Sequence, residues 1–585
     1  MKALAASILP IVAGAAVLGL VPAALAHGDK HGHEDMEMSD ADKPLPEDQY
    51  PPTYFALPDH RAAIYGHIGL MVLGWVFVLP AAVMLSLARS RYTLLVQFGF
   101  LALNAGGMLL GVIYNASTPD LYPNNAHHKL GWIVTSVVSA QVVIGLLARV
   151  AGMMKRAKSD GRAEERQGFI PVSTEAMAEH EARFSGPYGR FSNDSGQGTE
   201  PRTESLRSHS LSSGADSPAI SHKYHVDDPD ADDDLEAHVP MFSKSTKAHS
   251  VVANVASKIS DRFWKVLLFA YNSVDRTILI LGFIALCTGI IAYGRFFEGN
   301  GIFSGLAHWI KGGIFFWLGI FTLGRWAGSF GELGWAWNIR PKRSGQKWRP
   351  SAEFIESALI FLYGSTNIFL EHLGNWGSGW SATDLEHVSI TVLFIGGGLC
   401  GMLVESTRIR DLLNYTVTDA ARSGPEHNAY RDEESREELR EPETYSFSMN
   451  PIPALVILLL GIMMSSHTQE SMVSSMVHKQ WGNLLTGASF ARGFTYVLTW
   501  LRPPRSVYPS RPPTELLTAF GLISGGIIFM ASSSDTISGM IHYQLDAMFM
   551  YTVTMGLVGV LMAWVILLVA LKGWAARREA RARLR

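Results

Sequence analysis

Eleven stretches of this chain are apolar and long enough to cross a lipid bilayer, whose hydrocarbon core is about 30 Å thick. A spanning segment must satisfy its backbone hydrogen bonds internally, and a helix does this within one segment. The sequence therefore predicts an all-α polytopic membrane protein, and its 48% hydrophobic and 17% charged content agrees with that class. The predicted spans are residues 65–88, 94–114, 128–150, 275–294, 308–330, 353–372, 385–404, 451–467, 478–500, 514–532 and 546–572.

Charged residues orient these spans. Lys and Arg accumulate after every odd-numbered span, and the positive-inside rule places those ends in the cytosol. Residues 1–26 have the pattern of a cleaved signal peptide, with an uncleaved signal anchor as the alternative. The sequence thus predicts an integral membrane protein of the secretory pathway (ER, Golgi, vacuole or plasma membrane). Its N-terminus is expected in the lumen or outside, and its C-terminus in the cytosol.

Composition divides the chain into segments. The stretch after the third span is rich in Ser, Asp and Glu, so we expect a disordered linker whose serines are candidates for phosphorylation. A net charge of −3 without a basic, aromatic-interleaved patch predicts no nucleic-acid partner. The expected order is a signal peptide (1–26), a polar His-rich arm (27–58), a three-span unit (60–150), a cytosolic linker (151–260), an eight-span unit (262–572) and a basic cytosolic tail (573–585).

Thirteen of the 20 histidines fall on the predicted lumenal side, several of them at helix ends. Histidine is costly inside a bilayer and is a common metal and haem ligand, so this bias is the main indication of function.

The first group of histidines lies at the start of two spans. His67 opens the first span, and His127 and His128 open the third, which enters the membrane from the same side. His67 and one of the other two are therefore expected at one depth, where two facing imidazoles can ligate a haem. Hydrogen bonding to interfacial water is the alternative. Small residues beside them would leave room for a porphyrin: Gly66, Gly69 and Gly131.

The residues around this group resemble the cytochrome b561 family over about 90 residues. The matching positions are His67, Gly69-Leu70-Met71, Trp75 and Pro80, followed by His128-Lys129-Leu130-Gly131-Trp132 and Gln141-Val142-Val143-Ile144-Gly145. The resemblance implies a b-type haem, electron transfer and a redox partner. Those cytochromes carry two haems on a four-helix core, whereas the second span here has Gln97 and Asn104 but no histidine. A second haem on the cytosolic side is therefore not implied.

The order of segments is also similar to the fungal "yeast putative transmembrane protein" family. In that family a fungal domain of unknown function precedes a larger membrane domain, and the resemblance covers nearly the whole chain. It implies a fungal membrane protein with loose similarity to mitochondrial electron-transport proteins, and it assigns no reaction.

A second group of histidines is predicted to ring one end of the larger unit: His372, His387, His467, His478 and His542. Asp384 lies three residues before His387, and Asp546 lies four after His542 at the start of a predicted helix. Each pair is therefore expected to share one helix face. Mixed imidazole and carboxylate ligands are typical of zinc, iron or manganese sites. No HExxH signature is present, so a polar cap that hydrogen-bonds the loops is the alternative.

A third group lies in the arm. After cleavage behind Ala26, the free amine and ring of His27 can chelate Cu(II) or Zn(II) together with His31 and His33.

One cation stands inside a predicted span. Arg492 lies about twelve residues into the ninth span, where a charge is costly unless it is paired. Its expected partner is Glu353, Glu356 or Glu405, and snorkelling towards the cytosol is the alternative.

The leading hypothesis is redox or metal handling at the lumenal or external face, with b-haem electron transfer in the first unit. A divalent metal (Zn, Fe or Cu) is expected in the larger unit, and the lipid bilayer, a redox partner or a metal ion are the expected partners. A metal-ion or proton transporter and a non-enzymatic scaffold are the alternatives. No hydrolase triad, phosphate loop or nucleophilic cysteine arrangement supports another enzyme class.

Overall fold

All regular secondary structure in the described part of the chain is helical. The computed structural model describes residues 43–44, 46, 50–167, 261–299, 301–341, 350–367, 379–380, 382–422, 439–467 and 469–584. No strand occurs in these ranges, and the described parts of all eleven predicted spans are helical. Eight helices are long and apolar enough to cross a membrane, so the all-α polytopic prediction is confirmed. The predicted signal peptide, the arm histidines His27, His31 and His33, and residues 168–260 of the linker lie outside the described residues.

The helices follow one another in this order: α2 (Arg61–Val72), η2 (Leu73–Val78), α3 (Leu79–Leu87), α4 (Thr93–Ser117), α5 (Ala126–Gln167), α8 (Asp261–Gly294), α9 (Gly301–Ala327), η4 (Gly331–Leu333), α10 (Ala352–Asn367), α11 (Ala382–Glu405), α12 (Thr407–Arg422), η7 (Glu443–Ser446), α14 (Ile452–Ser466), α15 (Met472–Leu501), α16 (Pro513–Ala531), α17 (Ser534–His542) and α18 (Ala547–Arg583).

The described residues divide into two units. One contains the described residues up to 142 and from 269 onwards, and the other contains those between 143 and 268. The first three spans, up to residue 142, therefore share a unit with the later spans. Helix α5 also continues to Gln167, into the segment expected to be a disordered linker. Residues 151–167 are rich in Ala, Lys, Arg and Glu, which favour a helix.

The first span contains a π-helical turn, η2, between α2 and α3. Pro80 follows this turn and has no N–H to donate to the carbonyl of Val76, four residues earlier. Trp564 of α18 donates its Nε1–H to that carbonyl instead, over 2.9 Å. Because of the proline, the Val76 carbonyl is available to accept a hydrogen bond from Trp564, and this bond connects the first span to the last.

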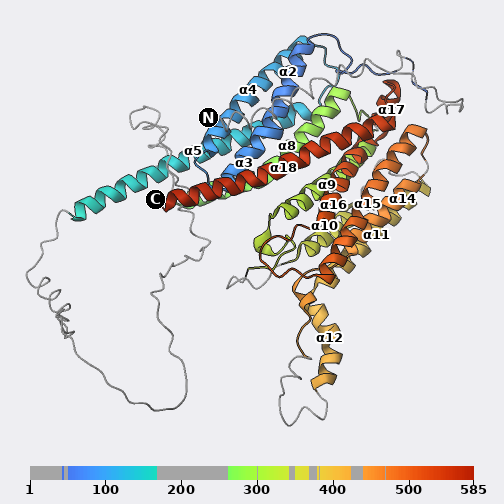
Figure 1. Cartoon of the computed structure of the whole chain (residues 1–585). Helices are drawn as coiled ribbons and strands as arrows, with labels where there is room; N and C mark the ends of the chain where they lie inside the picture. The colour runs from blue at the N-terminus through green and yellow to red at the C-terminus, as the bar shows by residue number, and fades with distance from the viewer. Residues whose placement is uncertain are drawn as a thin grey trace, which may run out of the picture. The chain divides into compact units, whose positions relative to one another are not determined.

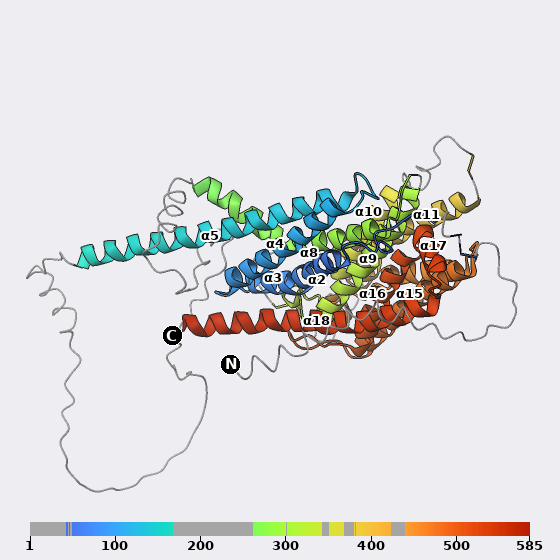
Figure 2. The same cartoon turned by 90° about the horizontal axis from the view of Figure 1, so that it is seen from above.

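Helix α18 lies beside α3, α9 and α16 (Figures 1 and 2). Residues 573–583, expected to form a basic tail, continue this helix. Glu579 is buried there and pairs with Arg91 just before α4, with Nε and Oε1 3.2 Å apart. The segment expected as the basic tail is thus helical up to Arg583, with Ala575 and Glu579 buried and its other side chains exposed.

The remaining helices form a bundle in which α10, α11, α14, α15, α16 and α9 are successive neighbours. Helix α16 lies at the centre of this bundle. In its most apolar stretch 72% of the residues are buried, whereas the corresponding share in α8 is 11%. In the core, Trp481 of α15 stacks on Phe529 of α16 with ring centres 4.0 Å apart. Large apolar side chains on the outer helices stay exposed, as Phe269 does at 74%, which suits a lipid-facing surface.

Candidate functional site

His67 on α2 and His127 on α5 lie next to each other in a T-shaped, edge-on arrangement. Their ring centres are 6.3 Å apart and the ring planes meet at 83°. His128 is exposed, and its backbone N–H donates to Asn125 Oδ1. Of the two histidines at the start of the third span, the structure therefore brings His127 to His67.

Each ring of this histidine pair (His67 and His127) is oriented by a backbone carbonyl. His67 Nδ1 lies 2.8 Å from the carbonyl oxygen of Gly107, and His127 Nδ1 lies 3.1 Å from that of Ala285. A carbonyl oxygen only accepts, so in both rings Nδ1 carries the hydrogen and Nε2 keeps its lone pair. Metal-binding histidines are commonly held in this way, by a hydrogen bond from the nitrogen that does not bind the metal.

Glycines on two further helices accommodate the rings. A Cβ on Gly111 of α4 would lie 2.7 Å from His67 Nδ1, and one on Gly289 of α8 would lie 3.0 Å from His127 Cε1. The pair therefore sits among four helices, α2, α4, α5 and α8, rather than within a three-span unit. Of the glycines expected to leave room for a porphyrin, Gly66 is covered by Leu110, whereas Gly69 and Gly131 have nothing within 4 Å of their Cβ positions.

The loop before α5 fixes His127 against α8. The Tyr122 hydroxyl donates to the carbonyl oxygen of Phe296, just beyond the end of α8, over 2.8 Å. Burial raises the pKa of Tyr122, so its phenol stays protonated and remains a donor.

The predicted ring of histidines is only partly brought together. His478 is 5% exposed, its Nδ1 donates to the Ser474 carbonyl, and its ring lies 6.1 Å from that of His308. His467 Nδ1 lies 3.4 Å from Glu386 Oε2. His372 lies outside the described residues, and the described side chains include no group of three or more His, Cys, Asp or Glu arranged to hold a metal. A metal site with His387 and Asp384 stays a prediction.

His542 and Asp546 do not share a helix face, contrary to the expectation. His542 is the last residue of α17, and a turn separates it from Asp546, which caps α18 by accepting from the Phe549 N–H over 2.7 Å. The His542 ring stacks on Tyr50, with centres 3.9 Å apart. Both side chains thus have structural contacts of their own.

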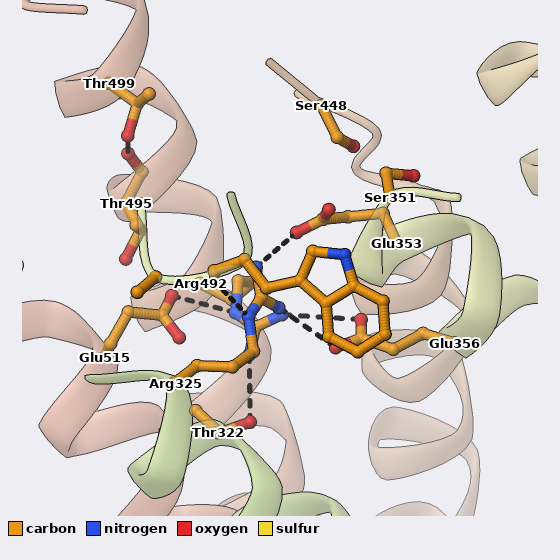
Figure 3. Close-up of polar contacts among 12 residues, drawn as sticks. Thr322, Arg325, Ser351, Glu353, Glu356, Ser448, Arg492, Thr495, Thr499 and Glu515 are labelled. Atoms are coloured by element: carbon orange, nitrogen blue, oxygen red, sulfur yellow. Dashed lines mark hydrogen bonds and ion pairs between the residues drawn. The ribbon is translucent and has the colours of Figure 1, made fainter. Parts of the chain in front are cut away.

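A buried network of two arginines and three glutamates lies among α9, α10, α15 and α16 (Figure 3). Arg325 places its two terminal nitrogens 2.8 Å from Glu353 Oε1 and 3.2 Å from Glu356 Oε1. Arg492 lies 3.5 Å from the other oxygen of Glu356 and 2.8 Å from Glu515 Oε1. Glu356 therefore bridges the two guanidinium groups.

This Arg–Glu network (Arg325, Glu353, Glu356, Arg492 and Glu515) is closed to solvent. No member is more than 6% exposed, and Glu515 is 0% exposed. The Trp337 ring packs against the Arg325 guanidinium in a cation–π contact, with its ring centre 4.2 Å from the guanidinium carbon.

The sequence-based assignment for Arg492 is partly correct. Glu356 is a partner, Glu405 instead accepts from Ser351 and Ser448, and snorkelling does not occur because Arg492 is only 5% exposed. Sequence reasoning missed Arg325 and Glu515, which lie near the ends of apolar stretches and resemble ordinary interfacial charges. The one available signal was that Arg492 needs a partner.

Comparison with known proteins gives two matches along the chain. Residues 281–573 match the family described as "Protein YTP1-like, C-terminal", and residues 48–151 match a domain of unknown function, DUF2427. The DUF2427 match covers the region of the first three predicted spans. No solved structure matches the chain.

Three fungal proteins are similar in sequence. An uncharacterized membrane protein of Schizosaccharomyces pombe is 32% identical over 88% of this chain and 94% of its own length. An uncharacterized membrane protein of Saccharomyces cerevisiae is 38% identical over 58% of this chain and 53% of its own length. Protein YTP1 of Saccharomyces cerevisiae is 21% identical over 47% of this chain and 49% of its own length. The chain thus belongs to the YTP1-like family of fungal integral membrane proteins, with an N-terminal DUF2427 domain.

Proposed function

We propose that this protein is a membrane redox protein in which His67 and His127 bind the iron of a b-type haem. The observation that carries the proposal is the histidine pair, whose two rings are adjacent and nearly perpendicular, each with its Nδ1–H donated to a backbone carbonyl. By the predicted topology, the pair lies near the lumenal or external face.

The spacing of the rings suits one metal ion between them. A metal–nitrogen bond is about 2.0 to 2.1 Å long and a ring nitrogen lies about 1.1 Å from the ring centre, so two imidazoles that held one ion would have centres up to about 6.3 Å apart. The His67 and His127 ring centres are 6.3 Å apart. With Nε2 left free on both rings, His67 and His127 would be able to hold the iron of a haem. When bound, a b-type haem would supply one-electron chemistry.

The chain's own residues orient these ligands. Hydrogen bonds from Nδ1 to the Gly107 and Ala285 carbonyls raise the basicity of each Nε2 and restrict ring rotation. Gly111 and Gly289 allow the rings to approach the helix backbones. Gly69 of α2 and Gly131 of α5 lie on the same two helices as the histidine pair, and no atom lies within 4 Å of their Cβ positions.

We expect His67→Ala and His127→Ala each to abolish the b-type band in a dithionite-reduced minus air-oxidised spectrum of the purified full chain. Either change leaves the iron with a single axial imidazole, and loss of one ligand weakens cofactor binding. The matched control is His128→Ala, which removes the neighbouring exposed imidazole and should keep the full band.

A full band in His67→Ala would show that the iron is held elsewhere. If the wild-type spectrum is flat but elemental analysis finds a metal that His67→Ala loses, the pair is a metal site rather than a haem site. A flat spectrum without a bound metal would overturn the proposal altogether.

A further inference from the structure

We propose that the Arg–Glu network binds one proton, held on Glu515. The network contains two guanidinium groups, which are always charged, and three carboxyl groups. With all three carboxyl groups ionised it carries a net charge of −1, and one proton makes it neutral.

Burial makes this charge balance important. The network lies inside helices of a membrane protein, and Glu515 is 0% exposed. An uncompensated charge in such a place is costly, and a buried carboxyl group takes up a proton when no cation balances it.

Geometry indicates which carboxyl group is protonated. Arg325 donates hydrogen bonds to Glu353 and Glu356, and Arg492 donates one to the second oxygen of Glu356. These two glutamates are therefore stabilised as carboxylates. Glu515 Oε1 lies 2.8 Å from Nε of Arg492, and its other polar contact is a hydrogen bond with the Thr495 hydroxyl, which can also accept from a protonated carboxyl group.

Nearby hydroxyl groups provide acceptors and donors for a neutral Glu515. Thr495 and Thr514 are hydrogen-bonded to each other, and Thr514 directly precedes Glu515. Tyr496 is 8% exposed and its hydroxyl has no hydrogen-bond partner among the described residues. It lies four residues after Arg492, on the same face of α15.

The charged groups that act on Glu515 are Arg325 of α9, Glu356 of α10 and Arg492 of α15. Glu353 of α10 belongs to the network through its pair with Arg325. Glu405, at the end of α11, lies near Glu353 and Arg410 of α12. Glu405 accepts hydrogen bonds from Ser351 and Ser448, both 2.6 Å long. Loss of the proton would thus leave an excess negative charge among α9, α10, α15 and α16, so protonation is coupled to the packing of these helices.

Glutamine substitutions test the assignment, because glutamine has the shape of a neutral glutamic acid. We expect Glu515→Gln to melt within about 2 °C of the wild type in detergent, whereas Glu353→Gln should lose more than about 5 °C. In infrared spectra, the wild type should show the C=O band of a buried protonated carboxyl group. This band should be absent from Glu515→Gln and unchanged in Glu441→Gln, a control at an exposed position.

Two results would overturn the proposal. One is a carboxylic acid band that persists in Glu515→Gln, which would place the proton elsewhere. The other is a wild type without this band whose melting temperature rises with sodium or potassium at constant ionic strength, which would identify a metal cation as the balancing charge. The infrared test still holds if Glu353→Gln fails to fold. None of these readouts depends on haem, so the histidine pair can fail its test independently.

Discussion

Replacing Arg492 by methionine is expected to prevent the accumulation of folded protein. The substitution removes the guanidinium that lies against Glu515 and Glu356 and leaves Glu356 dependent on Arg325 alone. Breaking a buried ion pair by removing one partner costs about 3 to 5 kcal/mol, which is a large part of the stability of a typical protein. The measurement is the yield of monodisperse protein after size exclusion in detergent, together with its melting temperature.

A matched control lies on the same helix. Arg502 caps the end of α15 and is exposed, so Arg502→Met should change stability by about 0.5 kcal/mol or less. In the double variant Arg492→Met/Glu356→Gln, Glu353 still pairs with Arg325 and the network is again neutral when Glu515 is protonated. We expect this variant to recover part of the lost yield. Equal losses in Arg492→Met and Arg502→Met would contradict the structural role of the network.

Replacing Gly526 by valine is expected to disrupt the contact between α9 and α16. A Cβ at Gly526 would lie 2.6 Å from the carbonyl oxygen of Gly312 and 2.6 Å from the backbone nitrogen of Phe316. These are backbone atoms, which cannot rotate away, so the two helices must separate. Overpacking of this kind costs about 3 kcal/mol, and small residues at helix contacts are a common means of close packing in membranes. Thermal unfolding in detergent measures the loss.

Gly559 of α18 provides the control for this steric effect. Its Cβ position has nothing within 4 Å, so Gly559→Val adds the same side chain without a clash. We expect it to melt close to the wild type. A similar loss in both variants would mean that the effect comes from helix propensity and not from the α9–α16 contact.

The candidate sites were predictable to different degrees. Topology alone predicts that His67, His127 and His128 lie at one depth in the membrane, because spans that enter from the same side begin at the same depth. The choice of His127 over His128 depends on the rotation of α5 and on contact with α8, which comes more than 100 residues later. The prediction that His542 and Asp546 share a helix face is wrong, because a turn separates α17 from α18.

The all-helical, membrane-spanning class follows from the amino-acid sequence, because apolar runs of spanning length have few other folds in a bilayer. The sequence also indicates that Arg492 requires a partner. The participation of Arg325 and Glu515 in the Arg–Glu network, and the packing of α8 and α18 against the first spans, are seen only in the folded protein. Hydropathy reports the solvent of a segment, whereas partners across a bundle depend on helix rotation and packing order. Contacts between residues far apart in the chain set both of these.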